Sequence, residues 1–459
     1  MLTTCIDSEA AKLEAIRTAL KQGTLNSIRE VLPDRAIEAA CGAAGWVFRE
    51  RLIPPVVAVL HWVLAAMWPE ESLAASWQLM WDTMVSRLPG AQGRSPGSGT
   101  VAKARRRLPL AMWEHLFVWL VERGESLWRG ADRWRGRRVV LLDGTTVSMP
   151  DEAALFDAFG RPRGKHGAYK YPLARVVTLA LARTKQVLAY VVGRYDEAET
   201  ALARRILGTL REGDVLIADR FHAAAHFYAR YVAQGAAFIT RKHQRLQVRK
   251  LKPVQQSGGG DFVAHLKINP QYRRRDPTLP QTVTVRFLHA SVRIRGKRTA
   301  LWLVTSLLDA TQYPAEEILA LYAERWRIET LFRELKVTLG ADVLRSHTPD
   351  TVRQEIAARF IAMNVLRLLI LEAALQHGAD PLELSFVHAV RAVIAFGPMM
   401  AVAPPCRLPT IYRAMLAEIA SHRNPHRPGR TEPRAVRRER KHYPTLRTTR
   451  ALWRAHRAA

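Results

Sequence analysis

Two short apolar runs, each followed directly by an aspartate, place the strongest constraint on how this 459-residue chain can fold. Val139–Leu142 precedes Asp143, and Val215–Ala218 precedes Asp219. Such runs predict strands that are buried on both faces of a sheet. Around them, from about residue 136, the pattern reads strand, strand, strand, helix, strand, helix, strand. This order predicts an α/β domain with a mixed sheet, in which both aspartates lie where a strand turns polar.

A third carboxylate lies in ALYAERWRIETLFRELKVTLG, which carries Tyr322, Arg325, Glu329 and Lys336. At about 100° per residue these four positions fall within an arc of roughly 60° on a regular helix. The glutamate can hold a divalent cation, and its neighbours can grip phosphate oxygens. Taken alone, this stripe is better explained as a solvated helix face, and each aspartate as a turn or cap residue. Together, the three carboxylates can converge on a pair of divalent metals for phosphoryl transfer.

These residues resemble the DDE transposases of bacterial insertion sequences, specifically insertion sequence family four. Asp143-Gly144-Thr145 matches the family's D-x-T context on the first core strand, and Ala218-Asp219-Arg220 matches its A-D-R context. The Tyr-Arg-Glu-Lys helix signature matches at all four positions. The resemblance extends over nearly the whole chain, including LPDRAIEAACGAAGWVFRERLIPP near the beginning and HRNPHRPGRTEPRAVRRERKHYP near the end.

The resemblance implies an RNase H-like catalytic core with a mixed sheet, interrupted by a β-rich insertion and flanked by helical regions. The expected organisation is a helical N-terminal DNA-binding domain (1–125), the first part of the core (136–242), the insertion (243–300), the second part of the core with the Glu helix (301–345), a helical C-terminal region (346–420) and a basic tail that is disordered without DNA (421–459).

The implied function is cut-and-paste DNA transposition, with cleavage at inverted-repeat ends and strand transfer into target DNA by a homodimer in a synaptic complex. Asp143, Asp219 and Glu329 are the expected catalytic residues and ligands of two divalent cations. Magnesium is favoured and manganese is the alternative, because carboxylates suit hard cations. Tyr322, Arg325 and Lys336 are expected to hold DNA phosphates. Two other interpretations stay open: a catalytically inactive DNA-binding descendant, and a nuclease that does not rejoin strands.

Two further DNA contacts are expected outside this constellation. Trp302 stands in LWLVTS, a context in which related hairpin-forming transposases use a tryptophan to receive a flipped base. An ordinary core tryptophan is the alternative, and the sequence does not determine whether a hairpin forms. Lys103, Arg105 and Arg106 lie at the start of a helix that Thr100 can cap, which predicts phosphate contact, with a solvated cationic face as the alternative.

Composition fits a nucleic-acid partner, because 70 Lys and Arg against 41 Asp and Glu give a net charge of +29. Three widely spaced cysteines form neither a disulfide framework nor a CxxC zinc pattern. The apolar stretch from Val56 to Trp68 is too short to span a membrane, and the first residues lack a signal-peptide pattern. We therefore expect a cytoplasmic, nucleoid-associated bacterial protein without a membrane role. No Walker loop or GxGxxG motif supports use of ATP or nicotinamide.

Overall fold

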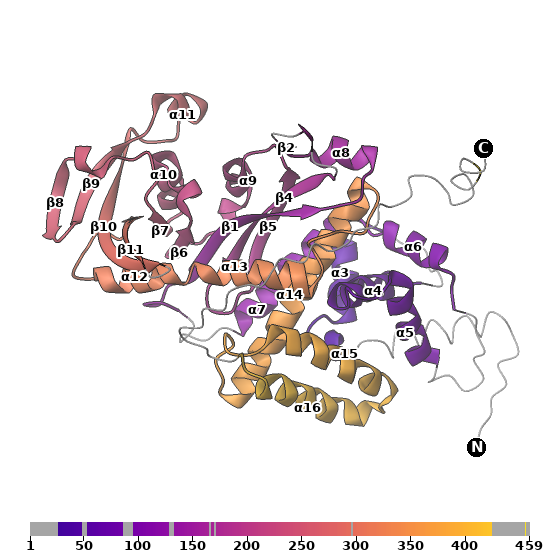
Figure 1. The fold of residues 1–459 in the computed structure, drawn as a ribbon. Coiled ribbons are helices and arrows are strands. Elements are labelled where there is room, and N and C mark those ends of the chain that lie inside the picture. Colours follow the sequence, from indigo (N-terminus) through magenta and orange to yellow (C-terminus); the bar gives the residue numbers. More distant parts are fainter. Residues whose placement is uncertain are drawn as a thin grey trace, which may run out of the picture. The chain divides into compact units, whose positions relative to one another are not determined.

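The computed structural model contains a nine-stranded mixed sheet, in the order β5-β4-β1-β6-β7-β11-β10-β9-β8 (Figure 1). The structure describes residues 26–47, 53–85, 95–127, 133–164, 167–168, 171–294, 297–424 and 455. The strands of the sheet are β1 (Val139–Ser148), β4 (Leu173–Leu181), β5 (Val187–Arg194), β6 (Val215–Ala218), β7 (Ala237–Arg241), β8 (Pro253–Gly258), β9 (Asp261–Lys267), β10 (Thr282–Ile294) and β11 (Lys297–Thr305). A separate two-stranded ribbon consists of β2 (Arg163–Gly164) and β3 (Gly167–Ala168).

The first five strands confirm the predicted α/β class with an RNase H-like core. β1 pairs antiparallel with β4 and parallel with β6, and β6 pairs parallel with β7. β6 ends at Ala218, opposite Leu142, whereas β1 continues to Ser148. The prediction that Asp143 ends its strand is therefore wrong, because Asp143 lies inside β1 and pairs with Thr178 of β4.

Successive side chains of β1 point to opposite faces of the sheet and pack in two apolar layers of the core. Val140 and Leu142 pack in a cluster with residues of α9 (Glu199–Ile206) and α10 (Ala225–Ala233). Val139 and Leu141 pack on the opposite face, in a cluster that includes residues of the later helices. This is the period of two expected for a strand that is covered on both sides.

The β-rich insertion extends the core sheet, because β11 pairs antiparallel with β7. The predicted boundary at residue 300 falls within β11. A short helix, α11 (Pro270–Arg275), connects β9 to β10. After β11 the chain forms α12 (Ala315–Ala323) and α13 (Trp326–Arg333), which return to the core.

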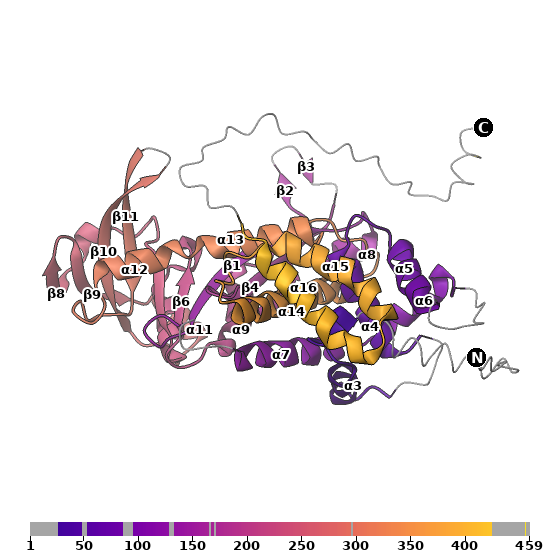
Figure 2. The same ribbon diagram turned by 90° about the horizontal axis from the view of Figure 1, so that it is seen from below.

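The long helix α14 (Pro349–His377) joins the two helical regions, since it contacts α4 and α7 as well as α15 and α16 (Figures 1 and 2). Its side chains are buried around most of its circumference. The other helices of these regions are α2 (Asn26–Arg29), α3 (Asp34–Ala43), α4 (Pro55–Met67), α5 (Leu73–Val85), α6 (Ser98–Arg106), α7 (Leu110–Ser126), α15 (Phe386–Val402) and α16 (Leu408–Ser421), and α8 (Ala153–Phe159) lies in the core. None of the helices within the described ranges is long and apolar enough to cross a membrane.

Most of the predicted tail, from residue 425 onward, lies outside the described residues.

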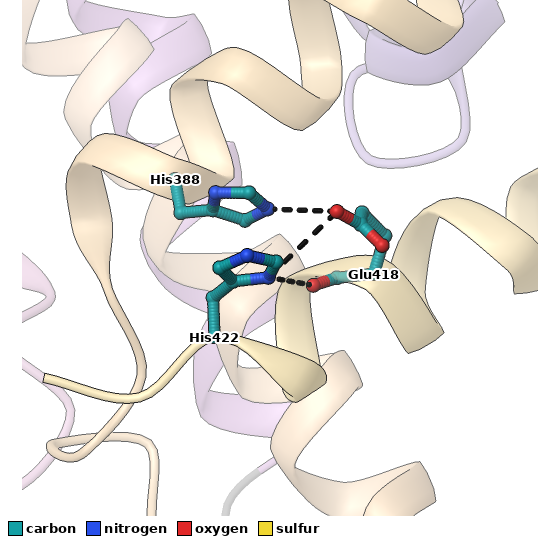
Figure 3. Close-up of side chains that lie close together, drawn as sticks. All are labelled: His388, Glu418 and His422. Atoms are coloured by element: carbon teal, nitrogen blue, oxygen red, sulfur yellow. Dashed lines mark hydrogen bonds and ion pairs between the residues drawn. The ribbon is translucent and has the colours of Figure 1, made fainter.

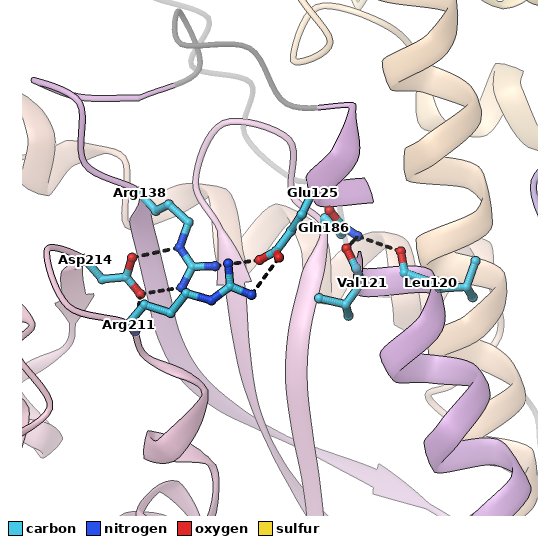
Figure 4. A network of polar contacts seen from close by, with 7 residues as sticks. All are labelled: Leu120, Val121, Glu125, Arg138, Gln186, Arg211 and Asp214. Atoms are coloured by element: carbon cyan, nitrogen blue, oxygen red, sulfur yellow. Dashed lines mark hydrogen bonds and ion pairs between the residues drawn. The ribbon is translucent and has the colours of Figure 1, made fainter. Parts of the chain in front are cut away.

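A buried polar network holds the helical region against the beginning of the catalytic strands (Figure 4). Arg138, just before β1, donates from Nε and Nη2 to the two carboxylate oxygens of Asp214, at 2.8 and 2.6 Å. Glu125 of α7 accepts from Arg138 and from Arg211, each at 2.6 Å. Such paired, bidentate contacts fix geometry more than they add net stability. They therefore fix the position of α7 relative to the beginnings of β1 and β6.

The ends of α15 and α16 are joined by a second polar cluster (Figure 3). Nε2 of His388 lies 3.0 Å from a carboxylate oxygen of Glu418, and Nδ1 of His422 lies 3.7 Å from the same oxygen. The two imidazole rings stack with centroids 3.3 Å apart. This cluster ties the first turn of α15 to the last turn of α16.

Candidate active site

Two carboxylates meet at the point where β6 ends beside the continuing β1. Asp143 and Asp219 follow directly after the register partners Leu142 and Ala218 on adjacent parallel strands. Oδ1 of Asp143 accepts from the backbone N–H of Gly144 at 2.8 Å. Oδ1 of Asp219 accepts from the N–H of Phe221 at 2.8 Å, which caps the short 3-10 turn at residues 220–222. Both side chains are thus oriented by their own backbone.

Arg325 connects the third carboxylate to this pair. Its Nη2 donates to Oε1 of Glu329 at 2.8 Å, and its Nη1 lies 4.0 Å from Oδ2 of Asp143. Tyr322 lies beside the same guanidinium and near Asp219, and burial raises the pKa of its phenol. The structure therefore brings together five of the residues that the sequence singled out.

The helix carrying Glu329 is not regular, which corrects the predicted single stripe. The N–H groups of Arg325 and Arg327 bond to carbonyl groups three residues earlier, so the chain tightens between α12 and α13. After Arg333 the chain forms a π-helical segment at residues 334–338. Each of these departures shifts the angular position of the following side chains relative to a regular helix.

Lys336 consequently lies toward the far end of β1. Its Nζ is 3.6 Å from Oδ1 of Asp342, and the carbonyl of Asp342 accepts from the N–H of Ser148 at 3.0 Å. Ser148 is five residues beyond Asp143 along the strand, or about 16 Å. Lys336 therefore contacts the segment beside Ser148, at the end of β1.

Asp143 stands out electrostatically, since its pKa is raised to about 6. Burial is the main cause, and the negative charges of Asp219 and Glu199 act in the same direction. The Gly144 N–H and Arg325 oppose the shift. A site with these carboxylates has the oxygen donors and negative charge that divalent cations such as magnesium require.

This raised pKa predicts the effect of Asp143→Asn on the metal-free protein. A folded-state pKa above the unfolded value means that wild-type stability falls as the pH rises from about 4 through about 6. The asparagine variant lacks this loss, so it should gain on the order of 3 kcal/mol over wild type at about pH 8 and little at about pH 4. Urea unfolding in the presence of a chelator at both pH values measures the difference. A constant difference between the two proteins would contradict the assignment.

Trp302 and the basic helix lie apart from these contacts. Trp302 is half-buried in β11, where its ring lies 4.6 Å from that of His289 and 6.3 Å from that of Phe262. Lys103 and Arg106 are exposed on α6.

Arg105 departs from the predicted phosphate contact of Lys103, Arg105 and Arg106. It is buried, with its guanidinium 3.3 Å above the ring of Trp62, and burial lowers its pKa to about 9. Arg105 therefore packs in the helical interior, where it is unavailable to phosphate. The helix also begins earlier than predicted, at Ser98, with Gly97 rather than Thr100 at the N-cap.

Three residues near the motif positions were not singled out from the sequence. Glu199, the first residue of α9, lies against Gly144 and binds the buried His222. No motif marks it, because its helix reads as an ordinary amphipathic segment. Phe221 and Trp326 are large aromatic residues that follow Asp219 and Arg325 in the sequence, with 69% and 64% of their surface exposed. Adjacency to motif residues was the signal available for both.

Comparisons with known proteins show that the chain is similar to transposases. The profile of the family described as "Transposase DDE domain" matches residues 134–365. Transposase InsG for insertion sequence element IS4 of Escherichia coli (strain K12) is 27% identical over 355 residues, which cover 75% of this chain and 77% of that protein. Putative transposase y4zB of Sinorhizobium fredii is 24% identical over 278 residues, covering 60% and 72% of the two chains. A solved structure of the piggyBac transposase synaptic complex with hairpin DNA aligns over 90% of this chain and 87% of that chain, with 10% identity and a TM-score of 0.45.

Proposed function

The chain belongs to the family of transposases with a DDE domain, and we propose that it catalyses cut-and-paste transposition of an insertion sequence. Membership implies an enzyme that acts on DNA and depends on a divalent metal. The observation that carries the finer proposal is the grouping of Asp143 and Glu329 around Arg325, with Asp219 directly after the adjacent strand β6. Carboxylates from three separate segments support a metal-dependent enzyme, because a protein that only binds DNA phosphate would gain nothing from negative charges in this region.

Each polar residue receives a distinct role in this proposal. Asp143, Asp219 and Glu329 would hold two magnesium ions, with manganese as a substitute. When bound, such ions activate the attacking oxygen and stabilise the leaving oxygen of a phosphodiester. Arg325 and Tyr322 hold the scissile phosphate beside them. Lys336 holds a phosphate farther along the strand, in keeping with its place near the end of β1.

The approach of the DNA is supported by a cleft that Phe221, two residues after Asp219, helps to line. This cleft of about 730 Å³ is lined by Arg204, Arg205, Arg230 and Arg275, and also by Glu197 and Asp276, which pair with Arg205 and Arg230. Guanidinium groups suit phosphate contacts. We propose that transposon DNA follows this cleft, that Lys103 and Arg106 make further phosphate contacts, and that two copies pair the two ends in a synaptic complex. The reaction would take place in the bacterial cytoplasm on nucleoid DNA.

Incubation of the purified protein with duplex DNA ending in the inverted repeat that flanks its gene tests the proposal. In magnesium we expect cleavage at the repeat, followed by joining of the freed 3′ ends to a target plasmid, and no reaction with chelator. Denaturing gels resolve both steps. Binding without cleavage would identify an inactive descendant, and cleavage without joined product would identify a nuclease.

A further inference from the structure

We propose that His388, Glu418 and His422 bind one Zn²⁺ ion where α15 begins and α16 ends (Figure 3). Two imidazoles and one carboxylate make up this group, whereas the site of the proposed function consists of carboxylates. Imidazole nitrogen suits zinc, and an all-oxygen set suits magnesium. The two sites should therefore select different metals, and zinc binding here does not depend on the proposed function.

The ligand atoms of the three side chains are spaced as a zinc ion requires. Nε2 of His388 and Nδ1 of His422 lie 3.0 and 3.7 Å from the same oxygen, Oε1 of Glu418. One ligand atom from each of the three residues lies within 4.8 Å of the other two. Two ligands of a tetrahedral zinc ion, each bonded at about 2.0 to 2.1 Å, are about 3.3 Å apart. Small rotations of the side chains therefore suffice to bring all three within bonding distance of one ion.

Backbone contacts already hold the two helix ends together around this group. The N–H of Ser385, the N-cap residue of α15, donates to the carbonyl of His422 at 2.9 Å. Leu384 and Arg423, the neighbours of these two residues, form an isolated antiparallel bridge. Oγ of Ser385 accepts from the N–H of His388 at 3.3 Å, which fixes the first turn of α15. Because the backbone is already in place, a metal ion has little more than side chains to order on binding.

The surroundings of the group suit a cation with one open coordination position. The side chains of Glu418 and His422 are 43% and 50% exposed, so an ion and a water molecule can reach them. Zinc with three protein ligands completes its tetrahedron with such a water. The carbonyl end of α16 adds a partial negative charge. The positive charge of the adjacent Arg423 is balanced by Glu383, 3.1 Å away.

The competing explanation is a polar cluster in which Glu418 pairs with both imidazoles and no metal takes part. A histidine–glutamate pair without a second imidazole provides the comparison. His347 and Glu152 form such a pair at 2.9 Å, and no third ligand joins them within the part of the chain that the structure describes. His347→Gln is therefore the matched control, and it should bind zinc as wild type does.

Calorimetric titration of the untagged, full-length protein with Zn²⁺ in excess Mg²⁺ measures the affinity, because magnesium competes for the catalytic carboxylates. We expect one zinc ion per chain in wild type. His388→Gln and His422→Gln should each weaken its binding about 100-fold or more, beyond the effect of residues that only support metal ligands. Glu418→Gln keeps the size of the side chain but loses the anionic ligand, so it should also weaken binding. Asp143→Asn should keep the zinc site.

Thermal melting with and without Zn²⁺ protects the test against misfolding. Zinc should raise the melting temperature of wild type, because it binds only the folded chain, and should do little for His422→Gln. His422 is the safest position to change, since it is half-exposed at the end of α16. Equal zinc affinity in wild type and His422→Gln, or no zinc binding by wild type, would overturn this inference and leave the proposed function standing. Loss of the zinc ion in Asp143→Asn would place it at the catalytic carboxylates and would overturn the inference as well.

Discussion

Replacing Asp143 by asparagine is expected to reduce strand cleavage by about 10³-fold or more while DNA binding stays near the wild-type level. The same result is expected for Asp219→Asn and Glu329→Gln. Each change keeps the size of the side chain but removes a negative charge from the position at which the cations would be held. Phosphate contacts come from other residues, so affinity for DNA should persist. Cleavage rates on inverted-repeat duplex and filter binding at fixed salt measure the two properties separately.

Glu383→Gln is the matched control for these substitutions. Glu383 is exposed and pairs with Arg423 at the end of the helical region, so its variant should cleave normally. The metal-free stability of Asp143→Asn sharpens the result, because that variant should be inactive and yet more stable than wild type at about pH 8. Near-normal cleavage by any one of the three carboxylate variants would remove that residue from the mechanism.

The alternation of strands and helices in the core was predictable because each element is marked by its own apolar pattern. Val139–Leu142 and Val215–Ala218 are buried strands, as their composition indicates. The end of β1 was not predictable in this way. Asp143 and Gly144 read as a turn, but their pairing with Thr178 and Val177 of β4 keeps the chain extended. That pairing depends on a strand some thirty residues later, which the turn preferences of neighbouring residues cannot predict.

In the candidate site, too, the contacts within one helix were predictable and those that depend on distant residues or on an irregular helix were not. Arg325 and Glu329 are one turn apart, so their contact follows from helical spacing. The place of Lys336 depends on a π-helical segment that the regular period of 3.6 residues does not anticipate. Arg105 was predicted to contact DNA but is buried by long-range packing against Trp62. Glu199 was not singled out, although the missing side chain at Gly144 lets it pack against β1.

Trp302→Ala is expected to leave folding and first-strand nicking intact and to impair hairpin formation by about 5- to 150-fold. This corresponds to the loss of about 1 to 3 kcal/mol of stacking between the indole and an extruded base. Trp302 is half-buried in β11 beside His289, so part of its ring remains available for stacking. A step-resolved cleavage assay on end-containing duplex, run beside thermal melting, measures the effect. Trp302→Phe should restore much of the hairpin step, because it keeps an aromatic face.

Trp113 supplies the contrast that separates stacking from core packing. It is fully buried in α7, so Trp113→Ala should cost about 3 to 5 kcal/mol of stability and impair every step alike. If Trp302→Ala behaves in that way, Trp302 is a core residue of the extended sheet. If nicking persists while the hairpin step fails, the β-rich insertion supplies a base-binding residue to the active site. The sheet that joins β11 to β7 would then be the structural reason that a residue of the insertion can act in the core.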